Sequence, residues 1–189
     1  MLKATENVST VDVNANTAMD FLDGAHRKFG ASNLGVTTYD TGFELKFNKD
    51  NTTVASATIS LTVKTRMAKW ARGSKAPDKA NMDAITQVGR LIASHEKAHR
   101  NSYRDAFNRS KVDQAVVGKT EDEAKKIIDS LGDILDRACE DLHKTEGKIT
   151  VTQNGAAFSA PKSGTRPMSR PYALWKRGTC PITFATETS

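Results

Sequence analysis

The sequence has no apolar run long enough to cross a membrane, and its first residues, Met1 to Asn7, lack the apolar core of a signal peptide. These absences exclude a recognisable membrane-spanning helix and a recognisable cleaved leader. We therefore expect a cytoplasmic protein, a protein exported by a route that needs no cleaved leader, or a chain whose leader has already been removed.

Cysteine is scarce as well. The two cysteines, Cys139 and Cys180, lie too far apart to form a C-x-x-C metal motif. They can be free thiols in a reducing compartment, or one disulfide that fastens the C-terminal segment to the second long helix. The sequence leaves both alternatives open.

Aromatic residues make up only 6% of the chain, which bears on its net charge of +6. The positive excess is concentrated in residues 64–79 and 162–177. Neither stretch has the aromatic interleaving of a face that binds single-stranded nucleic acid. The sequence therefore favours a solvated basic surface, and nucleic acid is not the expected partner.

The chain of 189 residues has the size of one ordinary domain, with 38% apolar and 26% charged residues. We expect a single domain over residues 1–160. Residues 161–189 hold four of the five prolines, and we expect this basic C-terminal segment to pack on the surface. The oligomeric state stays open.

The N-terminal part predicts short elements. Residues 1–15 contain alternating valines that predict an edge strand, and residues 16–28 predict a helix that ends before Gly30. His26, isolated in sequence, is expected on the surface. Asp40-Thr41-Gly42, between two short apolar runs, is typical of a hairpin.

Residues 54–63 form the clearest strand pattern, because the odd positions are apolar (Ala55, Ala57, Ile59, Leu61 and Val63) and hydroxyl residues alternate with them. Residues 65–77 predict a basic connector that contains Trp70. The connector either rims a cleft or is anchored to the core by Trp70, and we favour the anchor.

A short stretch carries a specific chemical pattern: His95-Glu96-Lys97-Ala98-His99 reads H-E-x-x-H. On a helix, histidines at i and i+4 lie one turn apart on the same face, so both can bind one metal ion. The glutamate beside the first histidine can then act as general base toward a metal-activated water molecule. Zinc is the expected cofactor.

The surrounding residues, 81–107, predict a helix that turns both histidines inward. At about 100° per residue, His95 and His99 fall in the middle of an apolar stripe formed by Ala84, Ile85, Val88, Leu91, Ile92, Tyr103 and Ala106. The alternative interpretation is a pair of core histidines with hydrogen-bonded neighbours. Two imidazoles and a carboxylate on a buried stripe are costly to leave unpaired, so we prefer the metal site.

A second long helix is predicted from Glu121 to Thr145, with Thr120 as its N-cap and Gly147 as its stop. Its core stripe comprises Ile127, Ile128, Leu131, Ile134, Leu135, Ala138 and Leu142. Residues 148–152 and 156–159 then predict a second hairpin. Together these elements predict an α+β fold with a small antiparallel sheet packed against two long helices.

A catalytic zinc site normally has three protein ligands, so a third ligand must come from outside the H-E-x-x-H pattern. Four candidates lie at the end of the second long helix. On the helical wheel, Glu140 and His143 point toward solvent, whereas Asp141 and Glu146 lie on opposite flanks. We prefer Glu146 as the ligand and Asp141 as a partner that orients a ligand histidine. Asp141 and His143 stay open as alternative ligands.

The order of these elements over residues 54–147 resembles a bacterial family of small zinc-dependent proteases, minimal zincins with an H-E-x-x-H helix. Asp141-Leu142-His143-Lys144-Thr145-Glu146-Gly147 is similar to the family's downstream motif of Asp and Thr followed by His-Gly. This chain has Glu146 in place of that histidine, and its threonine is displaced by one position. The resemblance implies a zincin-like fold, and Glu146 would make the site glutamate-type. Zincin architecture also implies that the strand over residues 54–63 is a candidate for pairing with an extended substrate peptide.

We therefore expect a zinc-dependent metallohydrolase. Among metallohydrolases we favour a peptidase that acts on a protein or peptide substrate. His95, His99 and Glu146 would bind zinc, and Glu96 would be the catalytic base. One alternative is a non-catalytic basic binding or scaffold protein with a structural or vestigial metal site. Another is a zinc amidase that acts on cell-wall peptide.

Overall fold

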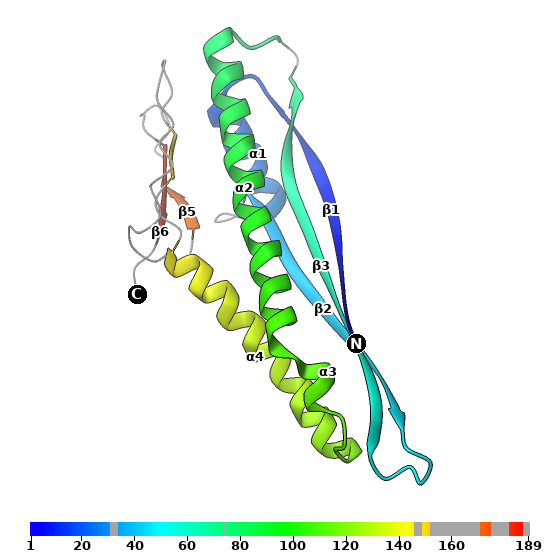
Figure 1. Ribbon diagram of the computed structural model, residues 1–189. Coiled ribbons are helices and arrows are strands. Elements are labelled where there is room, and N and C mark those ends of the chain that lie inside the picture. The colour runs from blue at the N-terminus through cyan, green and yellow to red at the C-terminus, as the bar shows by residue number, and fades with distance from the viewer. Residues whose placement is uncertain (31–33, 74, 146–148, 152–170, 175–181, 187–189) are drawn as a thin grey trace. The chain divides into compact units, whose positions relative to one another are not determined.

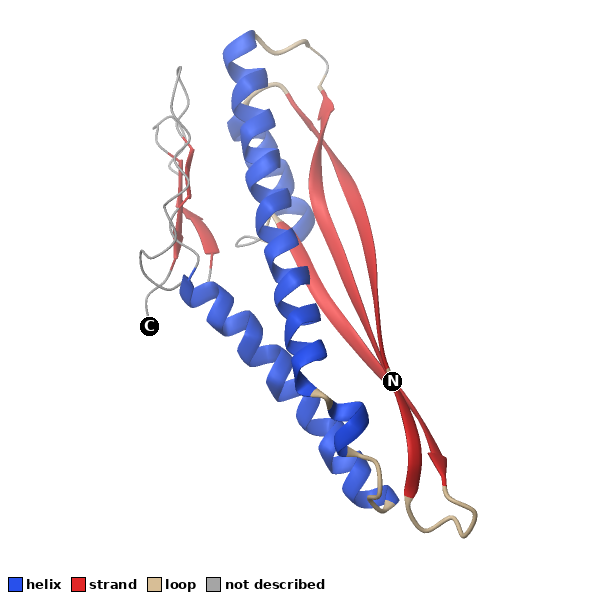
Figure 2. Ribbon diagram, viewed as in Figure 1, coloured by secondary structure: helices blue, strands red, loops and turns tan. Residues whose placement is uncertain are grey.

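The structure is a computed structural model that describes residues 1–30, 34–73, 75–145, 149–151, 171–174 and 182–186. The elements follow one another along the chain as β1 (Leu2–Ala15), α1 (Ala18–Phe29), β2 (Gly35–Phe47), β3 (Val54–Arg72), α2 (Lys79–Ser110), α3 (Val112–Ala115), α4 (Glu121–Thr145), β4 (Ile149–Val151), β5 (Pro171–Leu174) and β6 (Ile182–Thr186) (Figures 1 and 2). The predicted α+β class is confirmed.

The larger sheet has the strand order β1-β3-β2. Thr5 Oγ1 donates to Leu61 O, and Ser9 Oγ donates to Thr65 O, with the same sequence separation of 56 residues. A constant separation means that β1 and β3 run in the same direction. Ser60 Oγ bonds to Gly42 O, and Ala68 N bonds to Leu34 O, so β2 runs opposite to β3. The sheet is therefore mixed rather than antiparallel as predicted.

β3 is the central strand of this sheet, which corrects one prediction from the sequence. It has β1 on one side and β2 on the other. Since both of its edges face neighbouring strands, β3 offers no edge for pairing with a substrate peptide.

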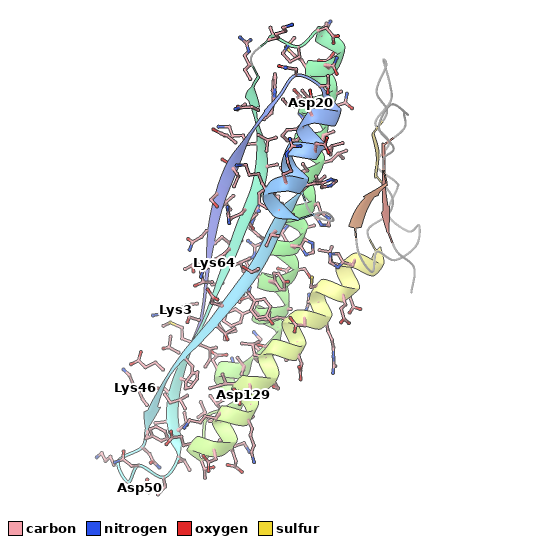
Figure 3. All side chains as sticks on the ribbon, turned by 180° about the vertical axis from the view of Figure 1, so that it is seen from behind. Lys3, Asp20, Lys46, Asp50, Lys64 and Asp129 are labelled. Carbon is pink, nitrogen blue, oxygen red and sulfur yellow. The ribbon has the colours of Figure 1, made fainter. Side chains whose placement is uncertain are left out.

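The chain divides into two compact units, and most of the long elements contribute residues to both. The first unit comprises Met1–Asn7, Thr37–Lys64 and His99–Cys139. Its core is formed by β3, α2, α3 and α4, with Ile59, Leu61, Phe107, Leu131 and Leu135 among its fully or almost fully buried side chains. Lys3, Lys46 and Lys64 project from the three strands of this unit and are exposed (Figure 3).

The second unit comprises Val8–Val36, Thr65–Ala98 and Glu140–Ser189. Its core joins β1, α1, β3 and α2, with Phe21, Leu22, Ala25, Ile85 and Val88 fully buried. Trp70 packs against this core and its Nε1 donates to Ala15 O at 3.0 Å. The predicted anchoring role of Trp70 is confirmed.

Side-chain caps fix where the helices begin. Thr17 accepts from Asp20 N at 3.1 Å at the start of α1, and Asp78 Oδ1 accepts from Asn81 N at 2.7 Å at the start of α2. At the start of α4, Glu123 N donates to Thr120 Oγ1 at 3.4 Å, and Thr120 N donates to Glu123 Oε2 at 3.0 Å. This reciprocal pair is a capping box. The predicted bounds of α4 are confirmed.

The first predicted hairpin is wrong. Residues 40–42 lie inside the continuous strand β2, and the chain turns at residues 48–53 instead. There, Asn48 Oδ1 accepts from Thr52 N at 3.0 Å and from Thr53 N at 3.3 Å, and Asn51 takes a positive φ of 55°. The Asn and Asp side chains of this turn satisfy the backbone groups that a strand would have paired with its neighbour.

Three smaller predictions need correction. The basic connector begins later than expected, because β3 continues to Arg72. Ala55 is exposed although the alternation placed it inward. Ile134 of α4 is 38% exposed and stands outside the core stripe.

β4, β5 and β6 form a separate antiparallel sheet in the order β4-β6-β5. β4 begins one residue after the strand predicted from Lys148. Its predicted hairpin partner, residues 156–159, lies outside the described residues. Over the part of the chain that the structure describes, no helix is both long and apolar enough to span a membrane.

Candidate metal centre

His95 and His99 lie one turn apart on α2, on the side of the helix that packs inward. His99 is 6% exposed and His95 is half-buried. The apolar stripe predicted for this helix forms the core on either side of them, with Ile92 before and Tyr103 after. The predicted inward register of the two histidines is confirmed.

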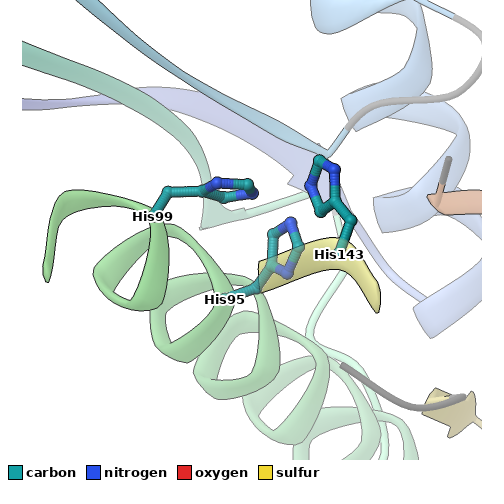
Figure 4. A group of neighbouring side chains, drawn as sticks. All are labelled: His95, His99 and His143. Atoms are coloured by element: carbon teal, nitrogen blue, oxygen red, sulfur yellow. The ribbon is translucent and has the colours of Figure 1, made fainter. Parts of the chain in front are cut away.

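His143, near the C-terminal end of α4, completes a group of three histidines. Its ring stacks on that of His95, with centroids 6.0 Å apart and planes 8° from parallel. One ring nitrogen from each of His95, His99 and His143 lies within 4.8 Å of the other two. Figure 4 shows the three rings turned toward a common space. Such convergence is what one metal ion requires of its ligands.

The position of His143 differs from the sequence-based expectation, which pointed it toward solvent. His143 is half-buried. The wheel describes α4 alone, whereas the ring of His143 lies against that of His95 on α2. His143 was one of the alternative third ligands that the sequence left open.

The other candidate third ligands have different outcomes. Glu146 lies outside the described residues, so its role as a ligand stays a prediction. Glu140 is exposed, as the wheel indicated. Asp141 is also exposed, and among the described residues it is not part of the converging group.

The carboxylate of Glu96 is buried beside β2. Glu96 is 4% exposed. A Cβ atom placed on Gly35 would stand 2.6 Å from Glu96 Oε1 and 3.1 Å from Arg66 O. The carboxylate therefore occupies the space that any side chain at residue 35 would fill. Nothing in the local sequence pattern links residues 35 and 96, so this role of Gly35 is visible only in the fold.

His99 also contacts a thiol through its Nδ1 atom. Cys139 Sγ lies 3.6 Å from His99 Nδ1. Burial, followed by a hydrogen bond with Cys139, raises the pKa of Tyr103, whose ring lies 6.4 Å from that of His99. The C-terminal half of α2 is thus joined to α4 by polar side chains as well as apolar ones.

Tyr39 of β2 extends this set of polar contacts. Its ring lies 5.0 Å from that of Tyr103, and its hydroxyl donates to Asp136 Oδ1 at 2.7 Å. Burial, then the hydrogen bond to Asp136, raises the pKa of Tyr39 to about 12. Both tyrosines therefore remain protonated hydrogen-bond donors at neutral pH.

The fourth histidine, His26 of α1, is not part of the group. It is half-buried rather than on the surface as predicted, and burial lowers its pKa although Asp23 opposes the shift. Its Nε2 is buried without a hydrogen-bond partner. A histidine held neutral in this way contributes to packing and offers a natural comparison for the other three.

The group of three fits a divalent transition metal. Imidazole nitrogen is a preferred ligand for zinc, and three histidines form one of the known catalytic zinc ligand sets. A tetrahedral ion bound by three protein ligands keeps one position open. Among the described residues no fourth His, Cys, Asp or Glu belongs to the group.

A comparison with known proteins places this chain in a family. No curated protein and no solved structure matches it. A family described as bacterial proteins of unknown function, DUF922, matches residues 8–148, a range that begins within β1 and includes every element from α1 to α4. The chain therefore belongs to the DUF922 family of bacterial proteins.

Proposed function

We propose that the protein is a zinc-dependent hydrolase, and that a peptide bond is the bond it cleaves. The observation that carries this proposal is the convergence of His95, His99 and His143 within 4.8 Å beside the buried Glu96. A zinc ion held by these imidazoles would supply Lewis acidity, which polarises a carbonyl and makes a water molecule more acidic.

The three histidines would bind the ion through neutral ring nitrogens. His95 and His99 are rigidly spaced by the helix, and His143 adds a ligand from α4. Because three imidazoles bring no negative charge, a bound zinc ion would retain a net charge of +2, which would suit it to polarise a substrate carbonyl. This favours catalysis over a structural role, for which four protein ligands are usual.

Glu96 would act as the general base. Its carboxylate takes a proton from the attacking water onto one oxygen and then passes the proton to the leaving amine. Burial beside Gly35 excludes bulk water from the carboxylate and fixes its orientation. Gly35 thus contributes to the reaction because its lack of a side chain leaves space for the Glu96 carboxylate.

The test compares wild type with Glu96→Gln for zinc content and for cleavage of a mixture of unstructured peptides, followed by mass spectrometry. We expect both proteins to hold about one zinc per chain. Loss of the base should lower the rate about 10²- to 10⁴-fold. Asp83→Asn is the matched control, because it changes an exposed carboxylate on the same helix to an amide.

Two results would contradict the proposal: equal cleavage by wild type and Glu96→Gln, or a zinc-loaded wild type that hydrolyses no amide. In the second case the metal would be structural. Cleavage of a cell-wall amide without cleavage of unstructured peptides would keep the hydrolase and replace its substrate class.

A further inference from the structure

A thiol lies beside His99, one of the three converging histidines. Cys139 Sγ lies 3.6 Å from His99 Nδ1. Resting on the function proposed above, we propose that Cys139 is a positioning residue, which accepts a hydrogen bond from His99 Nδ1 and thereby presents His99 Nε2 to the metal.

The chemistry of imidazole explains why this contact matters. A neutral histidine carries its proton on one ring nitrogen only, and the other nitrogen is the metal ligand. An acceptor at Nδ1 selects the tautomer that leaves the Nε2 lone pair available. The acceptor also fixes the ring's rotation about the Cβ–Cγ bond, so the imidazole does not have to be ordered when the metal binds.

The sulfur is itself held in place. Ser102 Oγ donates to Ala138 O at 2.8 Å, which fastens α2 to α4 one residue before Cys139. The Tyr103 hydroxyl hydrogen-bonds to Cys139 from the same side of α2. Tyr39 OH bonds to Gly132 O at 3.3 Å, two turns earlier along α4. The two bonds to α4 carbonyls hold the helix in place, and the Tyr103 hydroxyl holds the thiol itself.

Cys139 acts from outside the metal's own ligands. It does not join the converging group of ring nitrogens, although cysteine is a strong zinc ligand. A thiol is a weak acceptor compared with the carboxylates and carbonyls that usually orient ligand histidines. It therefore orients His99 without adding negative charge to the site.

The experiment measures the affinity of the intact chain for Zn²⁺ by competition with a chelator, and the absorption spectrum with Co²⁺ in its place. We expect Cys139→Ala to weaken Zn²⁺ binding about 10- to 100-fold and to change the Co²⁺ spectrum. Cys139→Ser keeps an acceptor at this position and should restore most of the affinity. Cys180→Ala, the chain's other cysteine, is the control and should match wild type.

Two outcomes separate this proposal from the proposed function. If wild type binds neither ion, both fail. If wild type binds but Cys139→Ala has wild-type affinity and spectrum, only the positioning role fails. Thermal unfolding in chelator identifies a variant that is merely unfolded. If Cys139→Ala is unfolded, the Zn²⁺ affinity of Cys139→Ser decides. An affinity near that of wild type supports the proposal. A loss of about 10- to 100-fold in a folded Cys139→Ser overturns it.

Discussion

Glycine at position 35 determines where the Glu96 carboxylate can lie. A methyl group there would stand 2.6 Å from Glu96 Oε1, well inside any normal contact, and 3.1 Å from the fixed backbone oxygen of Arg66. The carboxylate is the more movable of the two neighbours. A side chain at residue 35 should therefore displace the proposed base.

We predict that Gly35→Ala keeps the bound zinc, loses most of the hydrolytic activity and costs about 1–3 kcal/mol of stability through overpacking. The measurements are zinc content, peptide cleavage and denaturant unfolding. Gly89→Ala is the control, because a Cβ there meets nothing within 4 Å. In the middle of α2 this change should stabilise the protein by about 0.5–1 kcal/mol. Full activity in Gly35→Ala would show that Glu96 does not depend on this space.

At the scale of residues, the sequence predicts what a single helix determines. The spacing of His95, Glu96 and His99 fixes their relative directions, and the structure places both histidines inward. Gly35 and His143 reach the site from separate elements, so their roles depend on tertiary packing that no local pattern contains. The contact of Cys139 with His99 likewise joins residues 40 positions apart. Cys180 lies outside the described residues, so the choice between free thiols and a disulfide stays open.

At the scale of elements, the start of α4 is stabilised by its capping box. Thr120 Oγ1 accepts from Glu123 N, and Glu123 Oε2 accepts from Thr120 N. α4 carries both Cys139 and His143 in its later turns. The cap therefore supports the helix that supplies the third histidine.

We predict that Thr120→Ala lowers the free energy of unfolding by about 0.5–2 kcal/mol, the usual cost of losing such a cap. Denaturant unfolding at neutral pH measures it. Ser130→Ala is the control, since its hydroxyl bonds only within the exposed face of α4, to Ile127 O. An unchanged midpoint for Thr120→Ala would contradict a stabilising cap.

The same cap makes stability depend on pH. The hydrogen bond from the Thr120 backbone, followed by that from its side chain, lowers the pKa of Glu123 below its ordinary value of 4.5. A lowered carboxylate pKa gives stability that is present above the unfolded value and lost as pH falls through the folded value. Glu123→Gln should therefore lose less stability than wild type between neutral pH and pH values below 4.5.

Among the elements, helices with clear ends were predicted best. α4 has its N-cap, acidic first turn and apolar stripe in one continuous segment, and its predicted bounds are those observed. The hairpin after β2 was misplaced because Asp40-Thr41-Gly42 has turn composition, yet the turn lies at Asn48 to Thr53. The direction of β1 relative to β3 depends on contacts between residues about 56 positions apart, which strand patterns cannot show.

At the scale of the whole molecule, the α+β fold and the family of bacterial proteins are shown, and the hydrolytic role is our proposal. Exposed lysines and arginines along β3, such as Lys64, Arg66 and Lys69, account for part of the positive charge. Lys64 forms a surface ion pair with Asp40. Pairs of this kind contribute little to stability. We expect the protein's chemistry to reside at the histidines rather than on this surface.

The central claim is that three of the four histidines bind one metal ion. Zinc content after purification and dialysis tests it most directly in wild type, His143→Ala and His26→Ala. We predict about one zinc per chain in wild type and in His26→Ala, and far less in His143→Ala. Zinc retained at the wild-type level by His143→Ala, or lost equally from His26→Ala, would contradict the three-histidine site.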